Sequence, residues 1–184
     1  NAYYTCPTTY TNITVPNGSG ITTYNFPITV IPYTDLAVYL GPFGGPRPGF
    51  NYSNYITIKN NGNQTISSGT VTFTKDNALA IPSLPSGAIA TANGFTYNFT
   101  NLLPSEIRYV YVTLQVPTIP TVSIGQLVTN TVSVTIPSGD ANAINNNASL
   151  TQDIRGAYDP NDKHENHGGK ILHSTFTSND YLTY

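Results

Sequence analysis

Residues 108–116 read Arg108-Tyr-Val-Tyr-Val-Thr-Leu-Gln-Val116. Apolar side chains recur at every second position, namely Val110, Val112, Leu114 and Val116, and polar or tyrosine side chains stand between them. Successive residues of a β-strand point to opposite faces, so a period of two indicates a strand with one buried face. This segment therefore predicts a strand that contributes four residues to a hydrophobic core.

The same alternation recurs in six other segments, each bounded by the Gly, Pro, Asn and Asp residues that favour turns. They span residues 35–40, 52–59, 69–75, 95–99, 127–136 and 147–154. Residues 41–49 hold three prolines and four glycines and are predicted to form a loop. No amphipathic helix is evident. The pattern predicts an all-β fold, an Ig-like antiparallel β-sandwich of about seven strands. Its expected core includes Ile56, Ile58, Val110, Val112, Leu114, Val132 and Val134.

Three domain segments follow from this pattern. Residues 35–155 form the Ig-like sandwich. Residues 1–34 are interpreted as a β-hairpin, with strands at 11–15 and 21–26, that is the tail of a preceding β-domain. Residues 156–184 are interpreted as a linker and the truncated start of a following β-domain. The strand-like residues 181–184 should pair with the hairpin, with another copy of the chain or with the rest of the parent protein. Because no initiator Met or signal peptide is present, we expect a mature fragment of a longer protein.

Composition excludes two classes of partner. Charged residues make up 9% of the 184 residues, against about 25% in a typical domain. The net charge is −2 and the few Lys and Arg residues form no cluster, so binding to a nucleic-acid backbone is not expected. No apolar stretch approaches the ~20 residues of a membrane span.

Cys6 is the single cysteine, and it cannot form an internal disulfide. A lone cysteine is compatible with bacterial secretion and argues against a eukaryotic secreted domain, where disulfides are common. No His or Lys lies near it in the sequence to lower its pKa. We interpret Cys6 as a small buried apolar residue and not as a reactive thiol.

Several stretches resemble a known family. Asp35-Leu-Ala-Val38, Arg47-Pro-Gly-Phe50, residues 54–62 and Asn145-Asn-Asn-Ala-Ser-Leu150 resemble the Ig-like repeat of large bacterial surface proteins. Ala157-Tyr-Asp-Pro-Asn-Asp-Lys163, with residues 181–184, is similar to the opening of the conserved Y-D-P-N-D-K domain that follows such repeats in proteins exported by type IX secretion. The resemblance implies an extracellular or cell-surface stalk or adhesin region, and it transfers no catalytic residues.

A calcium site is one interpretation of the junction after the sandwich. Asp159, Asn161, Asp162 and Glu165 place oxygen ligands within seven residues, and Ca²⁺ prefers such ligands. The alternative is a plain turn, because Pro160 fixes φ and Asx side chains bond to local N–H groups. No EF-hand spacing is present, and no other cofactor is required.

A second oxygen-rich stretch comprises Asp140, Asn142 and Asn145 to Asn147. A turn role is favoured there, because the stretch connects two predicted strands and Asn and Asp tolerate tight backbone angles. His164, His167 and His173 lie in a polar, Gly-rich tract, where solvated histidines are expected more than a metal site.

An aromatic surface patch is predicted from three tyrosines. Tyr109 and Tyr111 lie on the face of their strand opposite the core valines, and Tyr55 could join them. Such a patch could bind sugars by stacking. The alternative is that Tyr is a strand former whose hydroxyl tolerates water, and the absence of Trp weakens the sugar interpretation.

These features favour a protein that is not an enzyme. Catalysis needs converging titratable groups, and residues 36–139 contain only Arg47, Lys59, Lys75, Asp76, Glu106 and Arg108. We expect a non-catalytic structural or adhesive module of an extracellular or cell-surface multidomain protein. The alternatives are a self-assembling surface filament subunit joined by strand pairing, or a carbohydrate- or protein-binding module. Expected partners are neighbouring domains, other copies of the chain or surface glycans.

Overall fold

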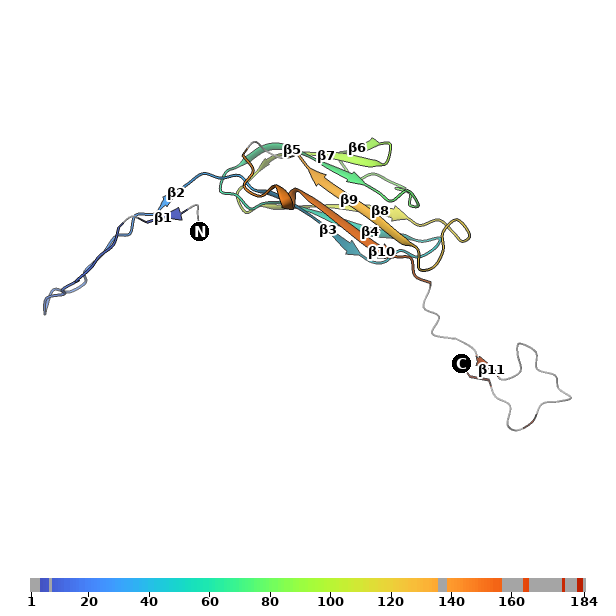
Figure 1. Cartoon of the computed structure of the whole chain (residues 1–184), viewed down its shortest axis with the longest axis horizontal. Helices are drawn as coiled ribbons and strands as arrows, with labels where there is room; N and C mark the ends of the chain where they lie inside the picture. Colours follow the sequence, from blue (N-terminus) through green and yellow to red (C-terminus); the bar gives the residue numbers. More distant parts are fainter. Residues whose placement is uncertain are drawn as a thin grey trace.

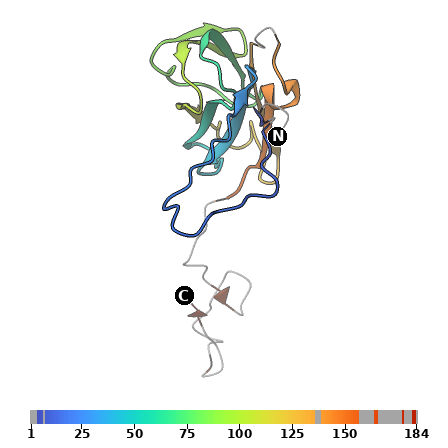
Figure 2. The same cartoon turned by 90° about the vertical axis from the view of Figure 1, so that its left-hand side faces the viewer.

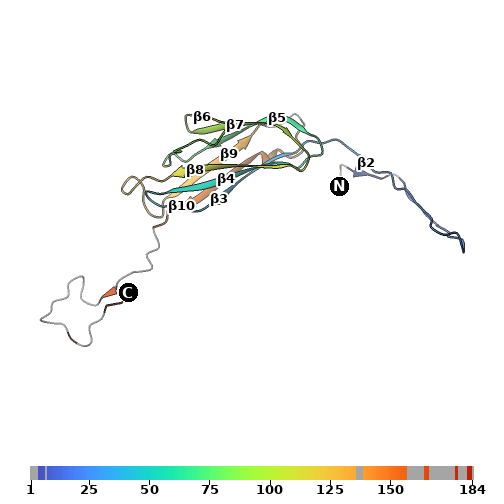
Figure 3. The same cartoon turned by 180° about the vertical axis from the view of Figure 1, so that it is seen from behind.

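Two antiparallel sheets pack face to face in the computed structural model, which describes residues 4–6, 8–135, 139–156, 164–165, 177 and 182–183. One sheet has the order β3-β4-β8, with β3 (Leu36–Phe43), β4 (Asn51–Asn60) and β8 (Ile107–Gln115). The other has the order β10-β9-β5-β7-β6, with β5 (Ile66–Thr74), β6 (Ala88–Thr91), β7 (Gly94–Leu102), β9 (Leu127–Val134) and β10 (Asn147–Asp153). The two layers are seen edge-on in Figures 1 and 3. The predicted all-β, Ig-like sandwich is confirmed.

The core lies between the sheets and is built by the alternation read from the sequence. Every core residue named above is buried, with at most 7% of its surface exposed. The largest buried side chains come from both layers, including Phe73 and Phe95 of the five-stranded sheet, whose rings stack with centroids 5.1 Å apart. Burial of apolar area of this kind is the main stabilising contribution to the fold.

Strand β6 was not predicted from the sequence. With it the sandwich has eight strands, whereas seven were expected. It is a short edge strand that pairs only with β7. Three of its four residues are exposed and the fourth is half-buried. A strand with no buried face has no alternation of apolar and polar residues, and so its sequence carries no strand signal.

Strand β3 extends three residues beyond its predicted end. Gly41, Pro42 and Phe43 were assigned to a loop, but they pair with Tyr55, Asn54 and Ser53 of β4. Strand β3 is at the edge of its sheet, and an edge strand tolerates Pro because its outward N–H groups are not required by a neighbour. The loop prediction therefore holds only from residue 44 onward.

A buried polar network joins the two sheets across the core. Asn130 of β9 donates from Nδ2 to Oδ1 of Asn54 in β4 at 2.9 Å. Asn54 in turn donates from Nδ2 to Oε1 of Gln152 in β10 at 3.0 Å. Asn130 Oδ1 accepts from the backbone N–H of Asp76 at 2.9 Å. Asn54 and Asn130 are fully buried, and their amides are thus partnered as buried polar groups require.

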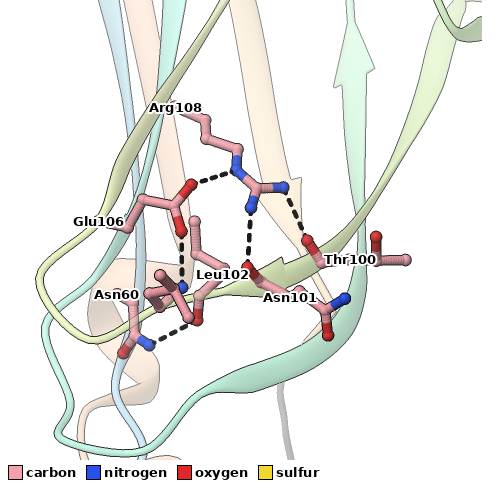
Figure 4. Close-up of polar contacts among 7 residues, drawn as sticks. Asn60, Thr100, Asn101, Leu102, Glu106 and Arg108 are labelled. Atoms are coloured by element: carbon pink, nitrogen blue, oxygen red, sulfur yellow. Dashed lines mark hydrogen bonds and ion pairs between the residues drawn. The ribbon is translucent and has the colours of Figure 1, made fainter.

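The turn between β7 and β8 carries the chain from one sheet to the other and is held by Arg108 (Figure 4). Its guanidinium donates to Glu106 Oε1 at 2.7 Å and to the carbonyls of Thr100 and Asn101 at 2.8 and 2.9 Å. Glu106 Oε2 accepts from the Leu103 N–H at 2.7 Å. The hydrogen bond from Arg108, and then that from the backbone of Leu103, hold the pKa of Glu106 below its usual value.

The N-terminal segment forms an arm that projects from one end of the sandwich (Figures 1 and 2). Strand β1 (Tyr4–Thr5) pairs with β2 (Thr29–Val30), whereas the predicted strands at 11–15 and 21–26 are not in a ladder. The phenol of Tyr10 donates to the Asn25 carbonyl at 2.8 Å. Cys6 is exposed, so its interpretation as a buried residue is wrong. None of the described residues of the arm is buried, so Cys6 has no core there in which to pack.

At the other end of the chain, β11 (His164–Glu165) pairs antiparallel with β12 (Leu182–Thr183). The strand-like end of the chain therefore has a partner that we did not expect, within its own last segment. Asp159, Asn161 and Asp162, predicted to bind calcium with Glu165, lie outside the described residues. The division into three domain segments stays a prediction.

Candidate binding surface

Five aromatic side chains gather on the outer face of the three-stranded sheet. We call this the aromatic face, and it consists of Tyr39, Phe43, Tyr55, Tyr109 and Tyr111. All but Tyr55 are between 54% and 65% exposed, and Tyr55 is half-buried. They point outward because the residues beside them, such as Val38, Val110 and Val112, point into the core.

Strand register brings these five side chains together. Tyr55 lies directly opposite Tyr111 on one side and Gly41 on the other. Tyr39 and Tyr109 both lie opposite Thr57. The Tyr55 ring centroid is 6.0 Å from that of Tyr39 and 6.5 Å from those of Tyr109 and Tyr111. Phe43 extends the series, because its ring is 6.1 Å from that of Tyr111. Cross-strand aromatic pairs at such distances are favourable.

Tyr55 is at the centre of the aromatic face because it is on the central strand β4. Its ring extends over Gly41, where a Cβ atom would lie 2.6 Å from the Tyr55 hydroxyl oxygen. The missing side chain at Gly41 therefore provides the space that the end of the Tyr55 ring occupies. The other four side chains surround it and remain accessible.

The aromatic face is rich in phenol hydroxyls and poor in charge. Its charged neighbours are at the two ends of the sheet. At one end Lys59 lies opposite Ile107 and Arg108 lies opposite Ile58, and at the other Arg47 lines a hollow together with Phe43. Tyrosine side chains combine a rigid apolar surface with a hydroxyl that can hydrogen-bond at low entropic cost. Interface cores are similarly enriched in aromatic residues and depleted of charge. The composition thus suits contact with a neutral partner.

A hollow of about 230 Å³ adjoins the aromatic face at the edge formed by β8. It is lined by Tyr109 and Tyr111 from β8, Tyr97 from β7, and Pro85 and Ser86 from the connection before β6. The two exposed tyrosines therefore line both the flat face and the hollow beside it. A ligand on this surface would have a stacking platform and a lateral recess.

The structure places the three predicted tyrosines on one surface, as the alternation indicated, but Tyr39 and Phe43 were missed. Tyr39 could have been found, because it stands between the inward Val38 and Leu40. Phe43 could not, because it follows Pro42 in a stretch that is typical of a loop. Whether this surface binds a ligand stays a prediction.

The two carboxylates between residues 36 and 135, Asp76 and Glu106, stabilise loops by accepting hydrogen bonds. Asp76 accepts from the N–H groups of Ala78 and Thr129 at 2.9 and 2.8 Å, and Glu106 is bonded to Arg108 and Leu103. In the part of the chain that the structure describes, no group of three His, Cys, Asp or Glu side chains is close enough to hold a metal ion. No helix among these residues has the length and apolar character to cross a membrane.

The fold and surface define an Ig-like β-sandwich with an open aromatic face. The sequence matches no known family model and no curated protein. Three of the solved structures that are similar in fold illustrate the likeness. A CARDB domain from Pyrococcus furiosus in complex with di-metal ions has a TM-score of 0.46 and 15% identity, and the match covers 70% of this chain and 97% of that one. A cohesin module of a family 33 glycoside hydrolase from Clostridium perfringens has a TM-score of 0.48 and 14% identity. This match covers 67% of this chain and 98% of the cohesin chain. The major pilin subunit of Bacillus cereus has a TM-score of 0.45 and 15% identity, and the match covers 77% of this chain and 46% of the pilin chain.

Proposed function

We propose that this chain is a non-catalytic adhesive and structural module of an extracellular or cell-surface multidomain protein. The observation that carries the proposal is the aromatic face, in which four exposed aromatic side chains surround the half-buried Tyr55 on one side of a sheet whose other side is packed in the core. Exposed apolar patches of this kind mark sites of interaction on soluble domains. The resemblance of residues 157–163 to the Y-D-P-N-D-K domain supports export by type IX secretion.

The partner that this surface fits best is a neutral glycan. Sugar rings present flat C–H faces that stack on aromatic rings, and their hydroxyls can bond to the phenol groups of Tyr39, Tyr109 and Tyr111. The absence of charged residues among the five side chains disfavours an acidic or basic partner. A neutral protein surface is the second candidate, and it would use the same side chains.

Binding to immobilised neutral polysaccharides tests the proposal directly. Retardation of the protein in gels that contain each polysaccharide gives an apparent Kd. The Tyr109→Ala/Tyr111→Ala variant should bind at least about tenfold more weakly, which corresponds to about 1.4 kcal/mol. The matched control is Leu127→Ala, which removes a similarly exposed side chain from the five-stranded sheet and should leave binding unchanged.

Two results would contradict glycan binding. The first is a wild-type protein that no neutral polysaccharide retards. The second is retardation that the double tyrosine variant retains. Light scattering on the same samples separates the filament alternative, because a subunit joined by strand pairing grows in mass with concentration. If the mass of the double tyrosine variant also rises with concentration, assembly occurs through the strand edges and not through the aromatic face.

A further inference from the structure

Two buried amide oxygens in this fold have no hydrogen-bond partner. They are Oδ1 of Asn145 and Oδ1 of Asn146, in the short helix η1 (Ala143–Asn146) between β9 and β10. Asn146 is completely buried, with 0% of its surface exposed. Buried polar atoms are almost always partnered, and an exception indicates an ion or a water molecule that completes the site.

The nitrogen atoms of the same two amides both donate to carboxylates. Asn145 Nδ2 donates to Asp35 Oδ1 at 2.9 Å, and Asn146 Nδ2 donates to Asp140 Oδ2 at 3.3 Å. Exchanging the oxygen and nitrogen of either amide would turn an acceptor toward a carboxylate, which accepts only. The amide orientation is therefore the correct one. In each amide the nitrogen donates to a carboxylate, and the oxygen on the same carbon has no partner.

Hydrogen bonds from two backbone N–H groups hold this cluster together although its two halves are far apart in sequence. Asp140 Oδ2 accepts from the Leu36 N–H at 3.0 Å, and the Thr34 carbonyl accepts from the Ala141 N–H at 2.7 Å. Thr34 and Asp140 form a parallel β-bridge. The segment that enters β3 is thus fixed against the connection between β9 and β10, and side chains from both segments belong to one hydrogen-bonded cluster.

The cluster carries two carboxylates, and no cationic side chain in the described part of the chain forms an ion pair with either of them. The ion pairs among the described residues join Arg108 to Glu106 and Arg155 to Asp153, and neither includes Asp35 or Asp140. Two carboxylates and two amide oxygens form a set of hard oxygen donors. Ca²⁺ takes six to eight such ligands, mixes charged and neutral oxygens, and tolerates irregular geometry, whereas Mg²⁺ requires a near-ideal octahedron.

We propose that Asp35, Asp140, Asn145 and Asn146 form a calcium site at the start of β3. The carboxylates supply the charge, the two unpartnered amide oxygens supply neutral ligands, and water completes the coordination. This site is distinct from the sequence-predicted one at residues 159–165 and independent of the aromatic face. A bound ion would fasten the arm's point of attachment to the β9–β10 connection.

The turn role favoured from the sequence accounts for only part of this geometry. Asp140 Oδ1 accepts from the Asn142 N–H at 2.8 Å, as expected for an Asx turn. A turn of that kind does not require two successive amides with buried oxygens, whose nitrogens reach carboxylates on separate segments. Asp35, which was read only as the start of a strand, contributes the second carboxylate.

Calorimetric titration of the chelator-treated full chain with CaCl₂ tests the site. We expect a weak site with a Kd on the order of 10⁻⁴–10⁻³ M, as in extracellular modules. The side-chain NH₂ resonances of Asn145 and Asn146 should shift on titration, since coordination of the amide oxygen polarises the group. The Asp35→Asn variant keeps an acceptor for Asn145 Nδ2 but removes one charge, and it should bind at least about tenfold more weakly. Asn145→Ala provides a second variant, which removes one neutral ligand.

Two controls separate this site from the rest of the chain. Asp153→Asn removes an exposed carboxylate that is paired with Arg155 and should leave calcium binding unchanged. Asp159→Ala/Asp162→Ala removes the sequence-predicted loop ligands and should also leave the Asn145 and Asn146 shifts intact. The proposal is overturned if the wild-type amide resonances do not respond to calcium. It is equally overturned if folded Asp35→Asn and Asn145→Ala proteins bind like the wild type.

Discussion

Gly41 lies directly opposite Tyr55 in the ladder between β3 and β4, and the Tyr55 ring occupies the space that a side chain at Gly41 would fill. Gly is unfavourable in a strand because it has no side chain to pack and loses much entropy on folding. A neighbouring aromatic ring that covers the bare backbone offsets this cost. The pair thus stabilises an edge strand and sets the position of the central tyrosine in the aromatic face.

Replacing Gly41 by Ala should destabilise the protein by about 1 kcal/mol, because the new methyl group must displace the end of the Tyr55 ring. Urea unfolding measures the change. In a Tyr55→Ala background the same replacement should cost almost nothing, so a double-mutant cycle gives the coupling between the two positions. Gly45→Ala is the matched control, since no atom lies within 4 Å of its Cβ position. An equal loss in both glycine variants would refute the close packing of Gly41 and Tyr55.

Replacing Asn130 by Ala should cost at least about 1–3 kcal/mol, because it leaves the buried Asn54 Oδ1 without its donor. The backbone N–H of Asp76 also loses its acceptor. Thermal or urea unfolding measures the loss. The control is Asn98→Ala, which removes an exposed amide bonded to the Thr70 hydroxyl and should change stability by less than about 0.5 kcal/mol. Similar effects at both sites would contradict a structural role for the cross-sheet network.

The sequence predicts the layers of this fold well because both layers have one face in the core. Alternation at Ile56, Val112 and Val132 requires only a buried face and an exposed face, and the burial of all three follows. Asn54 and Asn130 occur in the same inward phase, between Tyr52 and Ile56 and between Val128 and Val132. That position signals a buried polar pair, and it was missed because polar residues were read only as breaks in the pattern.

Other features depend on partners that no local pattern contains. Strand β6 forms because β7 offers it a free edge, and Phe43 is in a strand because β4 continues beside it. The convergence of Asp35 with Asn145 requires the register of both sheets, since 110 residues separate them. The tyrosines of the aromatic face could be assigned to a face from alternation, but their mutual distances depend on which strands are neighbours.

At acid pH the bond between Glu106 and Arg108 should be lost together with the stability that it provides. The pKa of Glu106 is held below the usual 4.5, so folding favours its ionised form. Its contribution is present above pH 4.5 and falls as the pH drops through the lower folded pKa. The free energy of unfolding of Glu106→Gln should therefore depend less steeply on pH below 4.5 than that of the wild type. Asp153→Asn removes the similar contribution of the Asp153–Arg155 pair and allows the two to be compared.

At alkaline pH stability should fall because of Tyr52. Burial raises the pKa of its phenol to about 12, against an ordinary value of 10.0. Between these values the unfolded chain loses the proton and the folded chain keeps it, so the free energy of unfolding decreases as the pH rises above 10. Tyr52→Phe should show a smaller decrease over this window, as measured by urea unfolding at each pH. An identical alkaline decrease in the variant would rule out Tyr52 as its source.

The arm joins the sandwich at the end where β3 begins, and the chain leaves β10 at the opposite end (Figures 1 and 3). Tension applied between these two points acts along the strands. The ladder bonds of an antiparallel pair run perpendicular to the strands, so pulling shears all the bonds between β3 and β4 at once and does not open them one by one. Such an arrangement resists extension until the whole ladder fails together.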